Sequence, residues 1–151
     1  MQKQPNSAMC FVCGRDNPIG LRIHFFVDEH NQVHADLTPR AEHQGFPGVM
    51  HGGLISTLFD ETIGRAAIAH NIWCMTAELK VRFKKPVRID EPLHVMGELV
   101  DINKRVLRGR GELRRVVDNT LLAEAEAVYI RLPDEQRAQM ESALLDWRVD
   151  E

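Results

Sequence analysis

The sequence predicts an α+β fold in which a curved antiparallel sheet of five to six strands wraps one long central helix. Three observations support this expectation. The 151 residues are enough for one domain, which at this length buries about 70% of the surface of the unfolded chain. An apolar segment with helical periodicity lies near the middle of the chain, and segments with strand-like alternation lie on both sides of it. A helix with so few charges must be covered, and a curved sheet can cover it.

The composition is that of an ordinary globular protein, with 44% hydrophobic and 27% charged residues. No apolar run approaches the roughly 18 residues of a membrane span, and no apolar stretch follows a basic start as in a secretory signal. A formal charge of −3 lacks the basic excess typical of nucleic-acid binders. Three cysteines are too few for a disulfide framework. We therefore expect a reduced, cytoplasmic protein with no nucleic-acid or membrane partner.

The first expected elements are two strands that form a hairpin. Glycine and proline are dense around residues 10–20, which indicates turns. Residues 21–27 and 33–37 carry the β-branched, aromatic or alternating side chains typical of strands, and residues 28–31 have the composition of a turn. A loop with two prolines and two glycines follows over residues 38–50.

The central helix is expected over residues 51–70. Its apolar residues recur at helical intervals: Leu54, Ile55, Leu58, Phe59, Ile63, Ala66, Ala67 and Ile68. At the rise per residue of an α-helix this segment is about 28 Å long. So little charge on its surface indicates that the helix is buried.

Four long strands and a terminal helix are expected after the central helix. The strands fall at 73–87, 93–102, 106–117 and 121–132. The helix is expected over about 134–147, with acidic residues in its first turn, where the helix dipole favours them. Repeats and linkers are absent from the sequence, so we expect one domain with its core at about 10–132. Exposed edges of the sheet would invite pairing with a second copy of the chain.

The start of the central helix carries the most informative motif, His51-Gly52-Gly53. Two glycines there leave backbone N–H groups without intrahelical partners and remove side chains that would keep a ligand away. Such a helix end suits an anion, or an oxygen that becomes anionic during a reaction. Asp60 follows within the apolar helix, and a buried carboxylate needs a partner or a task. Taken alone, the pattern also fits a structural helix start and an acid that points to water.

Together with Phe83-Lys84-Lys85-Pro86-Val87, this motif resembles the acyl-CoA thioesterases of the hotdog fold, in particular the phenylacetate-degradation type. Residues 10–14 (CFVCG) and 17–21 (NPIGL) resemble the N-terminal signature of one branch of that group. The resemblance covers about residues 10–132. It implies a hotdog fold and hydrolysis of acyl-CoA thioesters, with coenzyme A as part of the substrate and no separate cofactor.

The resemblance implies roles for five residues by position. Asp60 corresponds to the catalytic acid, acting as general base or as nucleophile, and Gly52 to the residue whose N–H polarises the thioester carbonyl. His51 corresponds to the histidine that shapes this turn, and Thr76 to a hydroxyl residue that helps to hold the water. Relatives often carry Asn or Gln six residues before the histidine. This chain has a glycine there, so the adjacent Gln44 takes the role if the loop holds one extra residue.

Substrate contacts are expected at Gly53 and at basic residues around the end of the first long strand, namely Lys84, Lys85 and Arg88. The basic side chains are candidates for binding the phosphates of coenzyme A. Lysines on strands also form solvated faces or protect sheet edges, so this alternative stays open.

Helix geometry gives an argument that does not depend on the family. Gly52 and Asp60 lie eight residues apart, about 12 Å along one helix, which a carboxylate side chain cannot span. If both groups act on one carbonyl, the site must join the helix start of one subunit to Asp60 of another. This predicts an obligate homodimer. Whether dimers pair into tetramers, the usual next step in this fold, stays open.

Two other functions remain alternatives. A hotdog hydratase or dehydratase needs a histidine base next to an acid, and His43 would have to reach that position from further away. A non-catalytic acyl-CoA-binding module would keep the pocket but would not need Asp60.

The cysteines do not indicate a metal site by sequence. Cys10-x-x-Cys13 is only half of a zinc site, and the chain has no second cysteine pair. Cys74 lies in a strand beside a tryptophan and is expected to be buried and inert.

Overall fold

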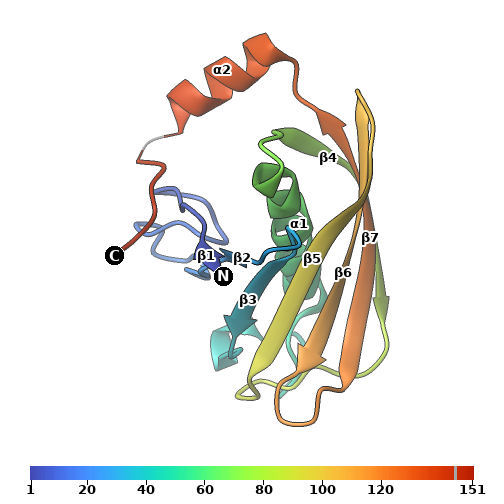
Figure 1. Cartoon of the computed structure of the whole chain (residues 1–151). Helices are drawn as coiled ribbons and strands as arrows, with labels where there is room; N and C mark the ends of the chain where they lie inside the picture. Colours follow the sequence, from blue (N-terminus) through green and yellow to red (C-terminus); the bar gives the residue numbers. More distant parts are fainter. Residues whose placement is uncertain (145) are drawn as a thin grey trace.

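A computed structural model describes residues 1–144 and 146–151 of the chain. In this part of the chain, seven strands form one antiparallel sheet around the helix α1 (Gly52–Ala69) (Figure 1). The strands are β1 (Gln2–Lys3), β2 (Phe26–Val27), β3 (Val33–Leu37), β4 (Cys74–Phe83), β5 (Leu93–Ile102), β6 (Val106–Arg115) and β7 (Leu121–Arg131). Their order in the sheet is β1-β2-β3-β5-β6-β7-β4. A short 3-10 helix, η1 (Ala41–His43), precedes α1, and α2 (Asp134–Ala143) follows the last strand.

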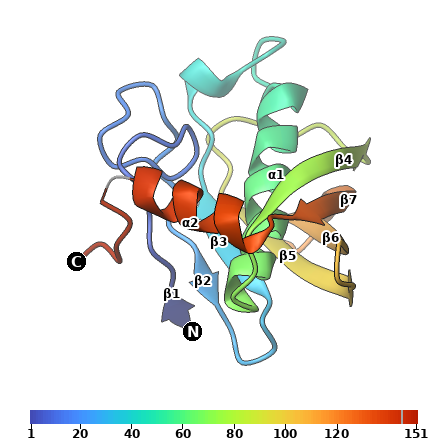
Figure 2. The ribbon, with the colours of Figure 1, turned by 90° about the horizontal axis from the view of Figure 1, so that it is seen from above.

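Helix α1 lies in the middle of the molecule. Figure 2 shows the curved sheet on one side of it and the N-terminal segment, residues 1–25, on the other. Most of its apolar residues are buried, as the periodicity predicts: Ile55, Leu58, Phe59, Ile63, Ala66 and Ala67, whereas Leu54 and Ile68 are half-buried. The chain leaves the helix through Asn71, whose φ of 58° lies in the left-handed region that asparagine tolerates.

Glycines on β5 and β6 allow α1 to approach the sheet closely. A Cβ atom at Gly97 would lie 2.9 Å from the backbone of Ile63, and one at Gly111 would lie 3.0 Å from Cδ1 of Phe59. Backbone and side chains of α1 occupy the space where these Cβ atoms would be. The distance between helix and sheet is therefore fixed by contact.

The N-terminal part of the sheet differs from the expectation of five to six strands. Residues 21–27 were expected to form one strand, but only Phe26–Val27 pairs with β3. Residues 21–25 are bonded instead to the irregular N-terminal segment, with the Leu21 N–H donating to Phe11 O at 2.8 Å and the Ile23 N–H to Val12 O at 2.9 Å. The strand β1 then adds to the outer side of β2 and brings the number of strands to seven.

The chain ends differ from the expectation too. The terminal helix ends at Ala143 rather than near residue 147. Arg148 instead forms a bridge with Asn6 of the N-terminal segment, and the Trp147 ring lies 5.8 Å from the ring of Trp73. The strand expected over 73–87 ends at Phe83 because the following chain bends toward Leu122, whose carbonyl accepts two backbone N–H groups.

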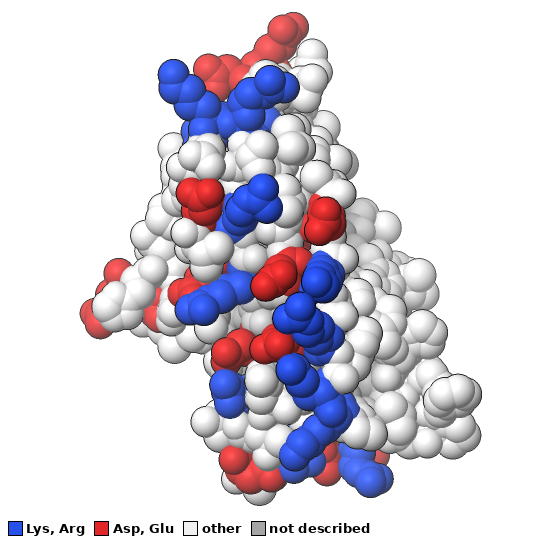
Figure 3. All heavy atoms as spheres, turned by 90° about the vertical axis from the view of Figure 1, so that its right-hand side faces the viewer, with Lys and Arg blue, Asp and Glu red and all other residues white. Residues whose placement is uncertain are grey.

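The outer face of the sheet is charged, with both signs interspersed (Figure 3). Ion pairs on this face include Arg110 on β6 with Glu98 on β5 at 2.6 Å. Lys84, the residue after β4, pairs with Glu124 on β7 at 3.3 Å. This face is therefore solvated, and the apolar face of the sheet holds α1. No helix in residues 1–144 and 146–151 is long and apolar enough to cross a membrane.

The close approach at Gly97 can be tested by substitution. Gly97→Ala should lower the free energy of unfolding by about 1–3 kcal/mol, because the new methyl group meets the backbone of Ile63 and helix or sheet must shift. Urea denaturation measures the change. Gly64→Ala is the matched control, since its Cβ would lie at an ordinary 3.5 Å from the Tyr129 ring. Equal losses in both variants would contradict the contact argument.

Candidate active site

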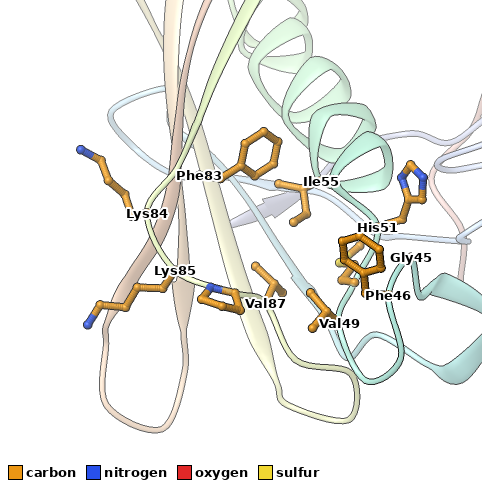
Figure 4. A pocket seen from close by; sticks show the side chains of 12 residues that line it. Gly45, Phe46, Val49, His51, Ile55, Phe83, Lys84, Lys85 and Val87 are labelled. Carbon is orange, nitrogen blue, oxygen red and sulfur yellow. The ribbon is translucent and has the colours of Figure 1, made fainter.

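An apolar cavity with a volume of about 790 Å³ lies at the start of α1. Three segments line it: the loop 45–51, the first turn of α1, and residues 83–87 at and after the end of β4. Figure 4 shows the apolar side chains of Val49, Ile55 and Val87 gathered around it, whereas Lys84 and Lys85 point away. A cavity of this size and character suits the apolar part of a small ligand.

His51 caps the helix. It is the N-cap residue, and its Nδ1 accepts the Gly53 N–H at 2.9 Å. Its carbonyl oxygen accepts the N–H groups of Leu54 at 3.0 Å and Ile55 at 3.2 Å. Because Nδ1 accepts a hydrogen bond, the proton of a neutral His51 ring sits on Nε2. Gly53, where a substrate contact is expected, thus already uses its N–H in the helix cap.

The Gly52 N–H is the remaining donor of this turn. In the part of the chain that the structure describes, it has no acceptor within hydrogen-bond distance. Gly52 lines the apolar cavity, and a Cβ there would lie 3.5 Å from the Phe83 ring. The positive end of the helix dipole and one free N–H therefore meet at the cavity wall.

The loop before His51 holds this turn in place. The His51 N–H donates to His43 O at 2.8 Å, and a Cβ at Gly45 would lie 3.3 Å from His51 Cα. Gln44 supports the loop itself, because its Oε1 accepts the Gly48 N–H at 3.1 Å. Gln44 is not among the residues that line the cavity. The side-chain oxygen of Gln44 is therefore used in a hydrogen bond within its own loop.

Asp60 lies on the same helix as Gly52 but outside the apolar cavity. Thr76 Oγ1, on β4, donates a hydrogen bond to Asp60 Oδ1 at 2.6 Å. Tyr129 donates its hydroxyl to the backbone oxygen of Asp60 at 3.0 Å. Asp60 is half-buried and lines a smaller cavity of about 240 Å³. The structure therefore brings Asp60 and Thr76 together and leaves the Gly52 N–H in a different cavity of the same chain.

Two groups near Asp60, the Cys74 thiol and the Tyr129 hydroxyl, have raised pKa values. Burial, with a further contribution from the Asp60 charge, raises the pKa of the Cys74 thiol to about 11. The same two causes raise the pKa of Tyr129 well above its usual range. Both groups therefore stay protonated near neutrality, so Tyr129 remains a donor and Cys74 is a poor nucleophile.

The basic residues occupy the outside of the cavity. Lys84 pairs with Glu124, and Lys85 and Arg88 are exposed. Lys84 and Lys85 form part of the cavity wall, but neither points its charge into the apolar space (Figure 4), and Arg88 is not among the lining residues.

Sequence reasoning missed two residues near the site. Tyr129 is the single tyrosine of the chain, and its place in an alternating strand could have indicated a buried hydroxyl in need of a partner. Glu61 follows Asp60 and lies beside Cys10, with Oε2 at 3.9 Å from Sγ. Nothing in the sequence could indicate that contact, because 51 residues separate the two.

The profile of the thioesterase superfamily matches residues 47–122, half of the chain. The chain belongs to this superfamily. The acyl-coenzyme A thioesterase THEM4 of Mus musculus is 30% identical over 136 residues, which cover 89% of this chain and 59% of that protein. THEM4 of Rattus norvegicus is also 30% identical, over 88% of this chain and 58% of that protein. This chain therefore spans less than two thirds of the curated relatives that it matches.

Solved structures agree on the hotdog thioesterase fold. A thioesterase superfamily protein superposes with a TM-score of 0.76 at 27% identity, over 80% of this chain and 62% of that one. A hypothetical thioesterase from Streptococcus pneumoniae, solved with coenzyme A, gives a TM-score of 0.64 at 18% identity, over 66% of this chain and 80% of that one. Among the sequence-based expectations, the hotdog fold and the membership of the thioesterase superfamily are thereby confirmed.

The cap formed by His51 leads to a stability prediction. His51→Ala should lower the free energy of unfolding by about 0.5–2 kcal/mol, because the Gly53 N–H loses its acceptor. His51→Asn should recover most of this loss, since asparagine is a preferred N-cap residue. Thermal and urea denaturation of the two variants would show the difference. An asparagine variant as unstable as the alanine variant would rule out capping as the role of His51.

Proposed function

We propose that the chain hydrolyses acyl-CoA thioesters at a site shared by two copies. The free Gly52 N–H at the wall of the apolar cavity carries the proposal, because an acyl-transfer site needs a donor where the oxyanion develops. Membership of the thioesterase superfamily and similarity to the mouse acyl-coenzyme A thioesterase support this reaction.

The edge strand β4 supports the arrangement of two copies. It pairs with β7 on one side only, and its Met75 and Phe83 side chains are each 54% exposed. β4 also runs alongside α1, with Thr76 beside Asp60 at one end. At its other end, Phe83 lies close to Gly52. Antiparallel pairing of β4 with its copy, about a two-fold axis near the middle of the strand, would therefore bring Gly52 of one copy beside Asp60 of the other.

The proposed reaction uses Asp60 as the general base. Its Oδ2 takes a proton from water, and the water oxygen adds to the thioester carbon. The carbonyl oxygen becomes anionic and accepts the Gly52 N–H of the other copy. The carbon–sulfur bond then breaks, and the leaving thiolate receives the proton that Asp60 holds. Thr76 positions the carboxylate through Oδ1 and leaves Oδ2 free for this transfer.

The two ends of the substrate meet different surroundings. The apolar cavity takes the apolar part of the substrate next to the carbonyl. Lys85 is exposed at its wall, and Arg88 is exposed next to the lining residue Val87, so both can bind the phosphates of coenzyme A. The pairing of dimers into tetramers, the phenylacetate-degradation subtype and the cytoplasmic location stay predictions.

The structure favours hydrolysis over the hydratase alternative. That reaction needs a histidine base, and His43 uses its Nδ1 to accept the Arg40 N–H at 2.9 Å. Burial and the nearby Arg40 charge also lower the pKa of His43, so the ring is a weaker base than an ordinary histidine. Assays with enoyl-CoA and hydroxyacyl-CoA compounds would separate the two reactions.

Asp60→Asn tests the base. It should lower kcat for acyl-CoA hydrolysis by about 100- to 10,000-fold, because the amide cannot take the proton of water. The amide oxygen can still accept the Thr76 hydroxyl, so stability should be close to that of the wild type. Thiol release from aromatic, short, medium and long acyl-CoA substrates measures the rate. Wild-type protein that binds these substrates without any turnover would support the alternative of a non-catalytic binding module.

Gly52→Pro tests the oxyanion donor. Proline removes the N–H but fits the first helical position, and His51 already has a ψ of 130° that suits a following proline. The expected result is a loss of about 100- to 1000-fold in kcat, as for other oxyanion donors. Gly52→Ala keeps the N–H and is the matched control, which should retain far more activity. Equal activity of the two variants would exclude the Gly52 N–H from the reaction.

Mixing the two inactive variants tests the shared site. A dimer of one Asp60→Asn chain and one Gly52→Pro chain has one site with both groups intact and one site with neither. An equal mixture, refolded together, should therefore recover about a quarter of wild-type activity if subunits pair at random. A site contained within one chain predicts no recovery at all. Sedimentation of the mixture checks that dimers form.

A further inference from the structure

Two thiols and a carboxylate form a cluster on the side of α1 that faces the N-terminal segment. Cys10 and Cys13 come from that segment, and Glu61 comes from α1. One ligand atom of each lies within 4.8 Å of the other two, and Cys10 Sγ is 3.9 Å from Glu61 Oε2. Cys13 is buried, Cys10 is half-buried, and the Glu61 side chain is 25% exposed. None of the three lines the apolar cavity.

The turn that carries the cysteines holds both sulfur atoms in place. The Val12 N–H donates to Cys10 Sγ at 3.3 Å, and the Gly14 N–H donates to Cys10 O at 2.8 Å. A Cβ at Gly14 would overlap the Cys10 carbonyl, so the turn requires glycine there. Ser7 Oγ accepts the Cys10 N–H at 3.2 Å, which leaves its hydroxyl proton for Cys13 Sγ at 3.8 Å. Such N–H and O–H donors stabilise sulfur in its ionised form.

The neighbouring charges orient the carboxylate toward the sulfur atoms. The Arg65 side chain is only 1% exposed, and its Nε donates to Glu61 Oε1 at 2.8 Å, which leaves Oε2 for the thiols. The hydrogen bond from Cys10 and the charge of Arg65 lower the pKa of Cys13 to about 6, although burial opposes them. The pKa of Cys10 is raised, chiefly because its proton is shared with Cys13. Without a cation, only one of the two thiols is therefore ionised at neutral pH.

We propose that Cys10, Cys13 and Glu61 bind one Zn²⁺ ion through two thiolates and one carboxylate oxygen. Thiolates select zinc over magnesium or calcium, and three protein ligands leave a fourth position for water on the partly exposed side of Glu61. Binding releases to solvent the proton that the two sulfur atoms share. Two thiolates, the Glu61 carboxylate, the Arg65 guanidinium and the divalent ion then sum to zero charge, which suits a partly buried cluster. The ion joins the N-terminal segment to α1 at the residue after Asp60.

Titration with Co²⁺ and Zn²⁺ tests the site in the whole chain, reduced and freed of metal with a chelator. One equivalent of Co²⁺ should produce thiolate-to-cobalt charge-transfer absorption, and Zn²⁺ should abolish that absorption by displacement. Zn²⁺ should also raise the unfolding temperature, because it binds the folded chain. Absence of both effects in the reduced wild type would overturn the proposal, and this result does not depend on any variant.

Variants assign the ligands. Cys10→Ser and Cys13→Ser should each abolish the charge-transfer absorption of the cluster. Loss of a residue that only hydrogen-bonds to a metal ligand weakens metal binding by about 10- to 100-fold. Glu61→Gln should weaken Zn²⁺ binding by more than this, because Glu61 is itself a ligand. Cys74→Ser is the matched control, because this third thiol lies outside the cluster and the absorption should persist. Absorption that survives in the double variant Cys10→Ser/Cys13→Ser would place the metal elsewhere and refute the assignment.

Discussion

The first turn of α1 is the constraint on which the site depends. Four backbone N–H groups at the start of an α-helix have no intrahelical acceptor. Here the His51 N–H donates to His43 O. The Gly53 N–H donates to His51 Nδ1, and the Leu54 N–H donates to His51 O. One residue and its neighbouring loop thus satisfy three of the four. The Gly52 N–H is left at the cavity, so the same hydrogen bonds that begin the helix also produce a donor for a ligand.

The fold could be predicted where a local pattern determines the element. The apolar repeat of α1 gave its bounds to within a residue or two, and β5 was expected over 93–102, where it lies. Prediction failed where pairing over long sequence distances decided the outcome. Residues 21–25 have strand-like side chains, but their backbone bonds go to the N-terminal segment. The last residues leave the helical pattern because Arg148 pairs with Asn6, 142 positions away in the sequence.

The candidate site could also be predicted only in part. The neighbourhood of Asp60 and Thr76 was expected from the family resemblance, and the structure contains their hydrogen bond. The motif also indicated unpaired N–H groups at its two glycines, because helix starts obey simple rules, and the structure leaves the one at Gly52 free but bonds the one at Gly53 to His51. No such rule predicts that Glu61 lies beside Cys10. Nor does one predict that the Gln44 side chain bonds to Gly48 instead of lining the cavity. Side-chain partners on loops depend on the path of the loop, which one sequence does not specify.

The glycines beneath α1 restrict how this protein can specialise. At Gly97 the sheet meets the backbone of α1, and at Gly111 it meets the Phe59 and Ile63 side chains, so helix and sheet are in direct contact at these two positions. With the proposed substrates, wider or narrower acyl groups would be accommodated where the cavity wall is made of side chains, at Phe46, Ile55 and Phe83. Selectivity can therefore evolve on one side of the helix while the other side stays rigid, and a change of substrate need not alter the core that holds the domain together.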